Sequence, residues 1–139
     1  MEFVENIKEE YDLSDVEPEE VSPLILAYIG DAVYETVIRT IVISKGNRQM
    51  SKVHKDSTNL VNAKAQADMI DAIMDSLTEE ELSIYKRGRN QKSETKAKNA
   101  SVSDYRKATG FEALIGYLFL AKRSPRMLEL IRKGLKNVI

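Results

Sequence analysis

Two carboxylates in this sequence lie where a folded chain would be expected to avoid them. Asp31 lies in the otherwise almost wholly apolar residues 24–35, and Glu112 lies in a second such run, residues 111–121. An ionised carboxylate that leaves water costs several kcal/mol unless a cation or hydrogen-bond donors compensate it. Because the two acids share this context although they are far apart in sequence, we expect them to meet in one metal-binding site.

The composition restricts which metal such a site could bind. The chain has no cysteine and a single histidine, His54, so thiolate zinc sites and histidine-rich sites are excluded. Oxygen ligands favour Mg²⁺, Mn²⁺ or Ca²⁺. An ion such as Mg²⁺ can activate a water and neutralise charge that develops on a phosphodiester, which points to hydrolysis of nucleic acid.

A stripe of side chains four residues apart accompanies the first carboxylate. It consists of Ala27, Asp31, Glu35 and Arg39. An ordinary surface ion pair explains Glu35 and Arg39 about as well as a functional role does. In the functional role, Glu35 could add a contact to the metal. Gly30 costs helix stability but allows another backbone or a ligand to approach, which favours a functional role for Asp31.

The net charge of −1 conceals an uneven distribution. Residues 1–20 hold nine acids and one lysine, whereas the other 119 residues hold 20 basic and 13 acidic side chains. Residues 86–107 hold eight basic and two acidic side chains, as expected of a surface that binds a polyanion, although a solvated charged loop would look the same. The side chains expected to contact a nucleic-acid backbone are Lys86, Arg87, Arg89, Lys92, Lys96 and Lys98, with His54 as a weaker candidate.

The elements that position these groups are helices. Ser22 and Pro23 start a helix that ends near residue 44, before Lys45 and Gly46. A second helical region with one break follows from about residue 51. Thr78 and Glu81 have the capping-box spacing that starts a short helix.

The second half of the chain continues this pattern around a long loop. Residues 87–103 lack apolar periodicity and form the predicted basic flexible loop. A strongly apolar helix spans about residues 104–122, and Ser124 with Pro125 starts a last amphipathic helix. The prediction is an all-α fold of one domain, residues 1–139, with an acidic N-terminal segment at residues 1–20.

No part of the sequence indicates a membrane or secreted protein. The apolar residues 24–43 are long enough to span a bilayer but carry three charged side chains, each expensive at its centre. The N-terminus lacks the basic flank and apolar stretch of a secretory signal. A cytoplasmic location is therefore expected.

Two motifs carry a family resemblance. Residues 28–33, Tyr-Ile-Gly-Asp-Ala-Val, resemble the signature helix of the ribonuclease III catalytic domain, and residues 111–116, Phe-Glu-Ala-Leu-Ile-Gly, resemble its second acidic motif. The resemblance extends from about residue 20 to the C-terminus. With no room for a double-stranded-RNA-binding domain after Ile139, the chain resembles the compact Mini-ribonuclease III branch of that family. Residues 52–55, 61–67 and 87–90 also resemble sequences of that branch.

The resemblance implies a function and also marks departures. Leu24, Ala27 and Thr109 stand where the larger enzymes carry further acids. The family implies a homodimeric endoribonuclease, dependent on Mg²⁺ with Mn²⁺ as a substitute, that matures the ends of 23S ribosomal RNA by cutting a double-stranded stem. It assigns catalysis and metal binding to Asp31 and Glu112, and it allows a large-subunit ribosomal protein as a further partner.

Two other functions remain open from the sequence. The missing acids favour a non-catalytic RNA-binding module on the same fold, and the acidic N-terminal segment would suit a helical interaction protein with a basic partner.

Overall fold

The computed structural model of this protein describes residues 1–91, 101–136 and 138, and these residues form helices with no strand. The helices are α1 (Phe3–Glu10), α2 (Pro23–Ile43), α3 (Met50–Val61), α4 (Ala63–Ile73), α5 (Glu79–Arg89), α6 (Val102–Leu120) and α7 (Ser124–Leu135), with short 3₁₀ turns at Pro18–Glu20 and Met74–Ser76. The predicted all-α fold is confirmed. None of the helices described is both long and apolar enough to cross a membrane.

Local capping interactions explain where several helices begin. The Ser22 hydroxyl accepts a hydrogen bond from the Ile25 amide, 3.4 Å away, at the start of α2. Thr78 and Glu81 form the predicted capping box of α5. Asn62 is the predicted break, because it ends α3 and its side chain caps α4.

The predicted basic loop is wrong at both of its ends. Lys86, Arg87 and Arg89 belong to the last turn of α5, where basic side chains interact favourably with the helix dipole. Gly88 in that turn packs closely against Gly110 of α6, which holds the turn in helical form. At the other end, residues 102 and 103 already belong to α6.

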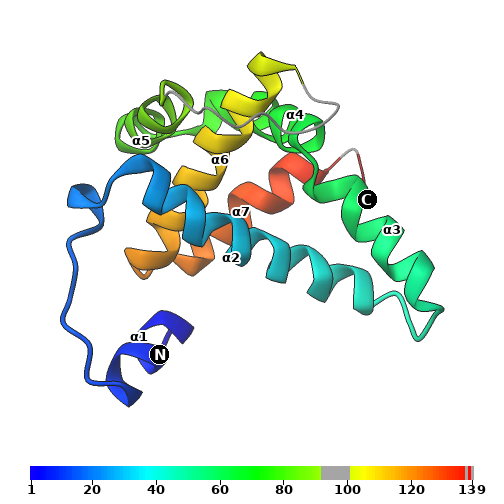
Figure 1. Ribbon diagram of the computed structural model, residues 1–139, viewed down its shortest axis with the longest axis horizontal. Helices are drawn as coiled ribbons and strands as arrows, with labels where there is room; N and C mark the ends of the chain where they lie inside the picture. Colours follow the sequence, from blue (N-terminus) through cyan, green and yellow to red (C-terminus); the bar gives the residue numbers. More distant parts are fainter. Residues whose placement is uncertain (92–100, 137, 139) are drawn as a thin grey trace.

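Helix α6 lies at the centre of the fold. Helices α2, α4, α5 and α7 all contact it, which explains why its sequence is apolar on almost every side (Figure 1). Phe111 of α6 meets Tyr34 of α2 edge to face with ring centroids 5.1 Å apart, and both rings are buried. The Tyr34 hydroxyl donates to the carbonyl of Leu60 at 2.9 Å, which ties α3 to the core.

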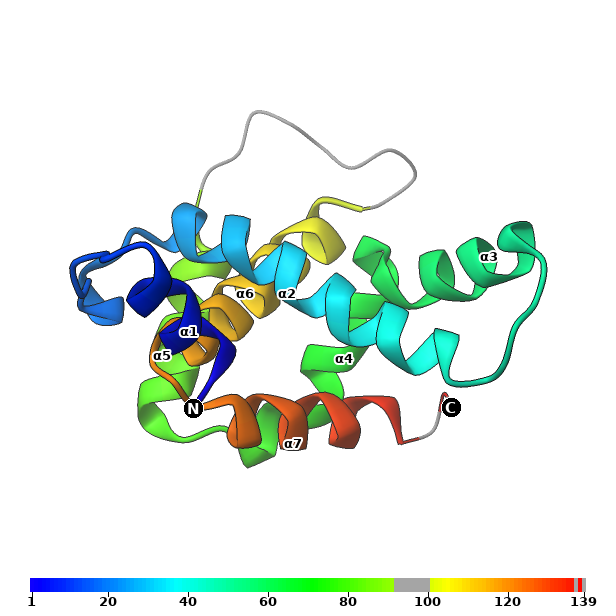
Figure 2. The same ribbon diagram turned by 90° about the horizontal axis from the view of Figure 1, so that it is seen from below.

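The acidic N-terminal segment lies against the body of the protein. Figure 2 shows the N-terminus beside the start of α7. There the Glu2 carboxylate accepts hydrogen bonds from the amide and the hydroxyl of Ser124, so that a negative charge lies at the positive end of the α7 dipole. The predicted helix start at Ser124 and Pro125 is confirmed, and the Ser124 hydroxyl contacts Glu2. Glu19 accepts a hydrogen bond from the Tyr117 hydroxyl at 3.3 Å.

Candidate active site

The candidate site forms where α2 and α6 cross with their backbones in contact. A Cβ atom on Gly30 would overlap the carbonyl oxygen of Glu112 and would stand 2.8 Å from the amide nitrogen of Gly116. A Cβ atom on Gly116 would likewise overlap the carbonyl oxygen of Leu26. The glycine beside Asp31 therefore admits a neighbouring backbone, as the sequence predicts, and the crossing places Asp31 next to Glu112.

The two carboxylates interact directly. Burial, as the largest cause, together with the hydrogen bond and the negative charge of Asp31, raises the pKa of Glu112 to about 9. Glu112 is partly buried, whereas Asp31 is exposed to solvent. The expectation that both acids are withdrawn from water is thus wrong for Asp31, because the crossing of α2 with α6 places Asp31 beside Glu112 but leaves it open to solvent.

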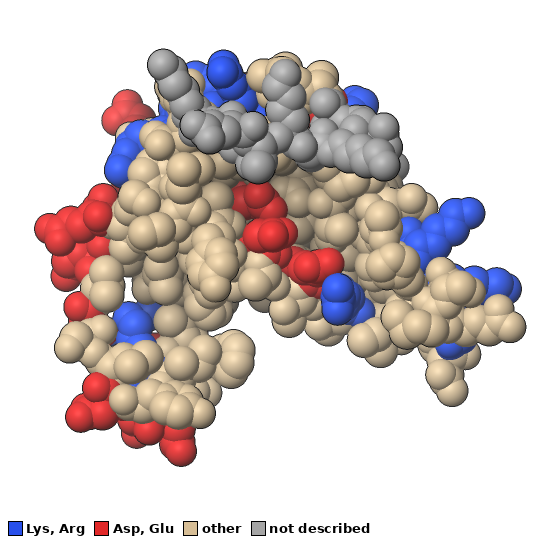
Figure 3. Space-filling view, in the orientation of Figure 1, with Lys and Arg blue, Asp and Glu red and all other residues tan. Residues whose placement is uncertain are grey.

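Glu35 lies near this pair, with a partner of its own. Its negative charge contributes to the raised pKa of Glu112. It also accepts a hydrogen bond from Arg39 at 3.0 Å in a largely exposed ion pair. Among the residues that the structure describes, no three acidic or histidine side chains converge as a metal-binding cluster. Figure 3 shows acidic side chains gathered at the middle of one face, over α2.

Gln66 is a component of the site that the sequence analysis did not identify. The side chain of this α4 residue is buried and contacts the carboxylate of Glu112, where its hydrogen bond lowers the pKa against the larger effect of burial. Its amide nitrogen also donates to the carbonyl of Val61 at 2.8 Å. A polar side chain between two alanines on an otherwise apolar helix face was the available signal.

At the positions where related enzymes would carry further acids, no acidic side chain from another part of the described structure takes their place. Ala27 is buried at the α2 interface. The Thr109 hydroxyl donates to the carbonyl of Tyr105, four residues earlier in the same helix, at 3.0 Å. A cation at this site would therefore meet a pair of carboxylate oxygens from Asp31 and Glu112, with water or a substrate phosphate as the remaining ligands.

Basic side chains border a small depression where α5 ends and α6 begins. A pocket of about 320 Å³ is lined there by Arg89, Arg106 and Lys107. Arg89 lies over the ring of Tyr85, 5.6 Å from its centroid, and Lys107 pairs with Asp71 at 3.1 Å.

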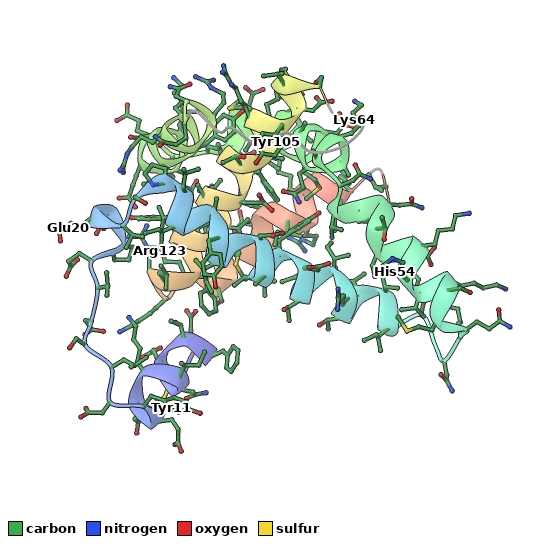
Figure 4. All side chains as sticks on the ribbon, viewed as in Figure 1. Tyr11, Glu20, His54, Lys64, Tyr105 and Arg123 are labelled. Carbon is green, nitrogen blue, oxygen red and sulfur yellow. The ribbon has the colours of Figure 1, made fainter. Side chains whose placement is uncertain are left out.

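The remaining predicted RNA contacts lie at different places. Lys86 and Arg87 are exposed at the end of α5. His54 is exposed on α3, at the opposite end of the molecule (Figure 4). Lys92, Lys96 and Lys98 fall outside the described residues.

Comparison with known proteins assigns the chain to a family. Residues 24–123 match the ribonuclease III domain, and they include α2, α6 and both candidate carboxylates. The chain belongs to the ribonuclease III domain family, and it is an endoribonuclease of that type.

The relatives narrow this class to one branch. The chain is 50% identical to Mini-ribonuclease 3 of Clostridium tetani, over 89% of this chain and 82% of the relative. It is 49% identical to Mini-ribonuclease 3 of Enterococcus faecalis, over 86% and 92%. A crystal structure of a Fusobacterium nucleatum protein, 31% identical, superposes with a TM-score of 0.79 and covers 91% of this chain and all of its own. The predicted membership of the Mini-ribonuclease III branch is confirmed.

Proposed function

We propose that this protein is a Mg²⁺-dependent endoribonuclease that cuts a double-stranded stem and matures the ends of 23S ribosomal RNA in the cytoplasm. The observation that carries the proposal is the contact of α2 with α6, which places Asp31 beside Glu112 on a rigid scaffold. Mn²⁺ has the same oxygen preference and would substitute.

The chemistry of the carboxylate pair suits a divalent cation. Bound Mg²⁺ would supply water activation and charge neutralisation at the phosphodiester. Two adjacent carboxylates repel each other when both are ionised, so a cation between them is favourable. Asp31 and Glu112 would hold the ion, and Gln66 would orient Glu112. Glu35, whose Oε1 pairs with Arg39, has a second carboxylate oxygen that would serve as an additional ligand.

The basic side chains around the end of α5 suit the backbone of an RNA duplex. A-form RNA hides its base edges in a deep groove, so a protein reads mainly its shape, phosphates and 2′-hydroxyls. Lys86, Arg87 and Arg89 lie on the last turn of α5, and Arg106 of α6 extends the same surface. We expect duplex affinity to fall as salt rises.

An exposed apolar patch supports the proposed homodimer. Leu24, Ile25 and Tyr28 lie on the first turns of α2, and the side chain of Tyr28 is 81% exposed in the single chain. Such side chains in one patch mark a protein contact more often than a solvent surface. A two-fold interface there would place two identical sites across one duplex, one for each strand.

The absence of a third converging acid in the described residues supports one rival, a non-catalytic RNA-binding module. One experiment separates the two functions: a labelled 23S rRNA stem is incubated with the protein in Mg²⁺ or in chelator, beside Asp31→Asn. The proposal expects cleavage only in Mg²⁺ and none by a folded Asp31→Asn. Cleavage that survives chelation would contradict metal dependence, and duplex binding without cleavage in every condition would establish the rival.

A further inference from the structure

A second basic surface lies at the end of α2 and the first half of α3. Residues 39–56 contain five basic side chains and one acid. The basic residues are Arg39, Lys45, Arg48, Lys52 and Lys55. Figure 3 shows basic side chains around the projecting α3 end of the molecule, well apart from the basic surface at the end of α5.

This surface contains a pocket of about 500 Å³ between the end of α2, the turn at residues 44–49 and α3. Arg39, Arg48 and His54 contribute the basic part of its lining, and Figure 4 shows His54 on α3. Asn47 and Ser57 add polar groups. The pocket thus combines hydrogen-bond donors with positive charge.

Arg48 has unused donors at this pocket. Its Nη1 donates to the carboxylate of Asp56 at 2.8 Å, whereas its buried Nε and Nη2 have no acceptor in the described parts of the chain. A buried donor without an acceptor is costly, and the flat guanidinium group matches the oxygens of a phosphate. An anionic oxygen bound beside Arg48 would supply the acceptor that these donors lack in the described parts of the chain.

Two features of the surroundings favour an anion. The N-cap residue of α3, Gln49, makes no side-chain capping bond, so its side chain satisfies none of the first amides of that helix. The pKa of Asp56 is lowered mainly by the hydrogen bond from Arg48, and the charges of Lys45 and Lys55 act in the same direction. The five basic side chains around the pocket therefore outnumber their acidic partners, which are Asp56 for Arg48 and Glu35 for Arg39.

We propose that the pocket of Arg39, Arg48 and His54 binds a backbone phosphate of the RNA duplex outside the catalytic centre. This inference rests on the proposed function. Arg39 follows Asp31 by eight residues on the same helix, a distance of about 12 Å along α2. A stem that is cut at Asp31 and Glu112 would reach this pocket, which sets how far the duplex must extend from the cut.

The test compares two variants that both break the Arg48 to Asp56 ion pair, Arg48→Gln and Asp56→Asn. Binding of a 23S rRNA stem is measured in chelator, to prevent cleavage, over a range of salt concentrations. Arg48→Gln should weaken binding about tenfold and lower the salt slope by about one. Asp56→Asn should retain the affinity, although both variants lose similar thermal stability.

Two further variants and an ion control complete the design. Lys45→Gln makes the same charge change outside the lining of the pocket and should weaken binding less than Arg48→Gln. Arg48→Lys retains the charge but loses the planar, two-pronged donor arrangement of the guanidinium group. Its affinity should therefore lie between that of Arg48→Gln and that of the wild type. Inorganic phosphate should raise the thermal stability of the wild-type protein more than that of Arg48→Gln.

The outcomes distinguish this inference from the proposed function. If the wild type binds and cleaves the stem but Arg48→Gln binds as well as Asp56→Asn, the pocket inference fails alone. If Lys45→Gln weakens binding as much as Arg48→Gln, the general positive charge of the surface explains the binding, and the pocket inference fails. Loss of the phosphate effect without loss of RNA affinity would assign the pocket to a free anion and overturn the inference. A wild type that binds no duplex would remove both proposals.

Discussion

Gly30 lies against Glu112 so closely that any side chain at residue 30 would overlap the Glu112 carbonyl oxygen. Gly30→Ala must therefore push α2 away from α6 and should lower the free energy of unfolding by about 3 kcal/mol. It should also reduce cleavage in the fraction that remains folded, because Asp31 moves away from Glu112. Denaturant unfolding and single-turnover cleavage measure the two effects.

A substitution on the exposed side of the same helix provides the control. Ala32→Ser adds an oxygen at a solvent-exposed position of α2 and should change the unfolding free energy by no more than about 0.5 kcal/mol. An equally stable Gly30→Ala variant would show that the two helices can separate at no cost.

The positions of the helices could be predicted because their signals are local. The caps at Ser22 and Thr78 each depend on residues within three positions, and both are present in the structure. The break in the second helical region was predicted without a position, and the structure places it at Asn62. The apolar residues 104–122 likewise predicted a helix, and the structure surrounds it with others. The sequence predicted a close approach at Gly30 but not which residue makes it. A missing Cβ permits a close contact without determining the partner.

The rest of the site depends on contacts between segments distant in sequence. Asp31 is exposed because of the angle at which α2 meets α6, and an apolar run cannot reveal that angle. Gln66 reaches Glu112 only because α4 packs beside α6. The predicted loop was too long because basic residues without apolar periodicity still continue α5, whose glycine packs against α6.

Gln66 should act as a positioning residue for Glu112. Gln66→Leu removes the hydrogen bond to the carboxylate, and we expect kcat to fall about 10- to 100-fold with little change in KM, as for other groups that orient a metal ligand. The Mg²⁺ concentration for half-maximal cleavage should rise. Both are measured with a labelled duplex at several metal concentrations.

Tyr34→Phe is the matched control for the structural role of Gln66. Tyr34 and Gln66 each donate a hydrogen bond to a backbone carbonyl at the end of α3, those of Leu60 and Val61. Each loss should cost roughly 1 kcal/mol of stability. Tyr34→Phe should retain normal metal dependence, and a similar loss of kcat in both variants would contradict the positioning role.

The basic surface at the end of α5 should contribute to duplex binding through phosphate contacts. Arg87→Gln combined with Arg106→Gln should weaken binding for all duplex sequences and lower the salt slope by about two. Lys107→Gln removes a lysine that already pairs with Asp71, so its effect should be smaller. An unchanged slope in the double variant would place the RNA elsewhere on the protein.

The apolar patch at the start of α2 should hold the proposed dimer together. Tyr28→Glu would place a charge in the interface, so the variant should sediment as a monomer at concentrations where the wild type is dimeric. Leu13→Glu changes another exposed apolar side chain, in the N-terminal segment, and should leave sedimentation unaltered. A dimeric Tyr28→Glu protein would exclude this surface as the interface.

The buried ion pair between Glu81 and Arg126 should make stability depend on pH. Two nitrogens of Arg126 donate to the Glu81 carboxylate at 2.8 and 2.9 Å, and Glu81 is only 3% exposed. The hydrogen bond from Arg126 lowers the pKa of Glu81 below its ordinary value. Glu81→Gln leaves Arg126 with the exposed carboxylate of Glu129 and the carbonyl of Ser76, so it should cost about 2 kcal/mol near neutral pH.

The direction of the pH effect follows from the lowered pKa of Glu81. Since the folded protein holds the proton less tightly than the unfolded chain, the stabilisation is fully present above the ordinary pKa of a glutamate. It is lost as the pH falls through the folded value. The difference in unfolding free energy between wild type and Glu81→Gln should therefore shrink below about pH 4.

An exposed ion pair on a neighbouring helix provides the comparison. Lys64→Gln breaks the pair with Asp68, whose side chains are 69% and 62% exposed, and should cost no more than about 0.5 kcal/mol at neutral pH. Denaturant unfolding at intervals from pH 7 to pH 3 measures all three proteins. If Glu81→Gln costs as little as Lys64→Gln at pH 7, the contact of Arg126 with Glu81 does not stabilise the packing of α5 against α7.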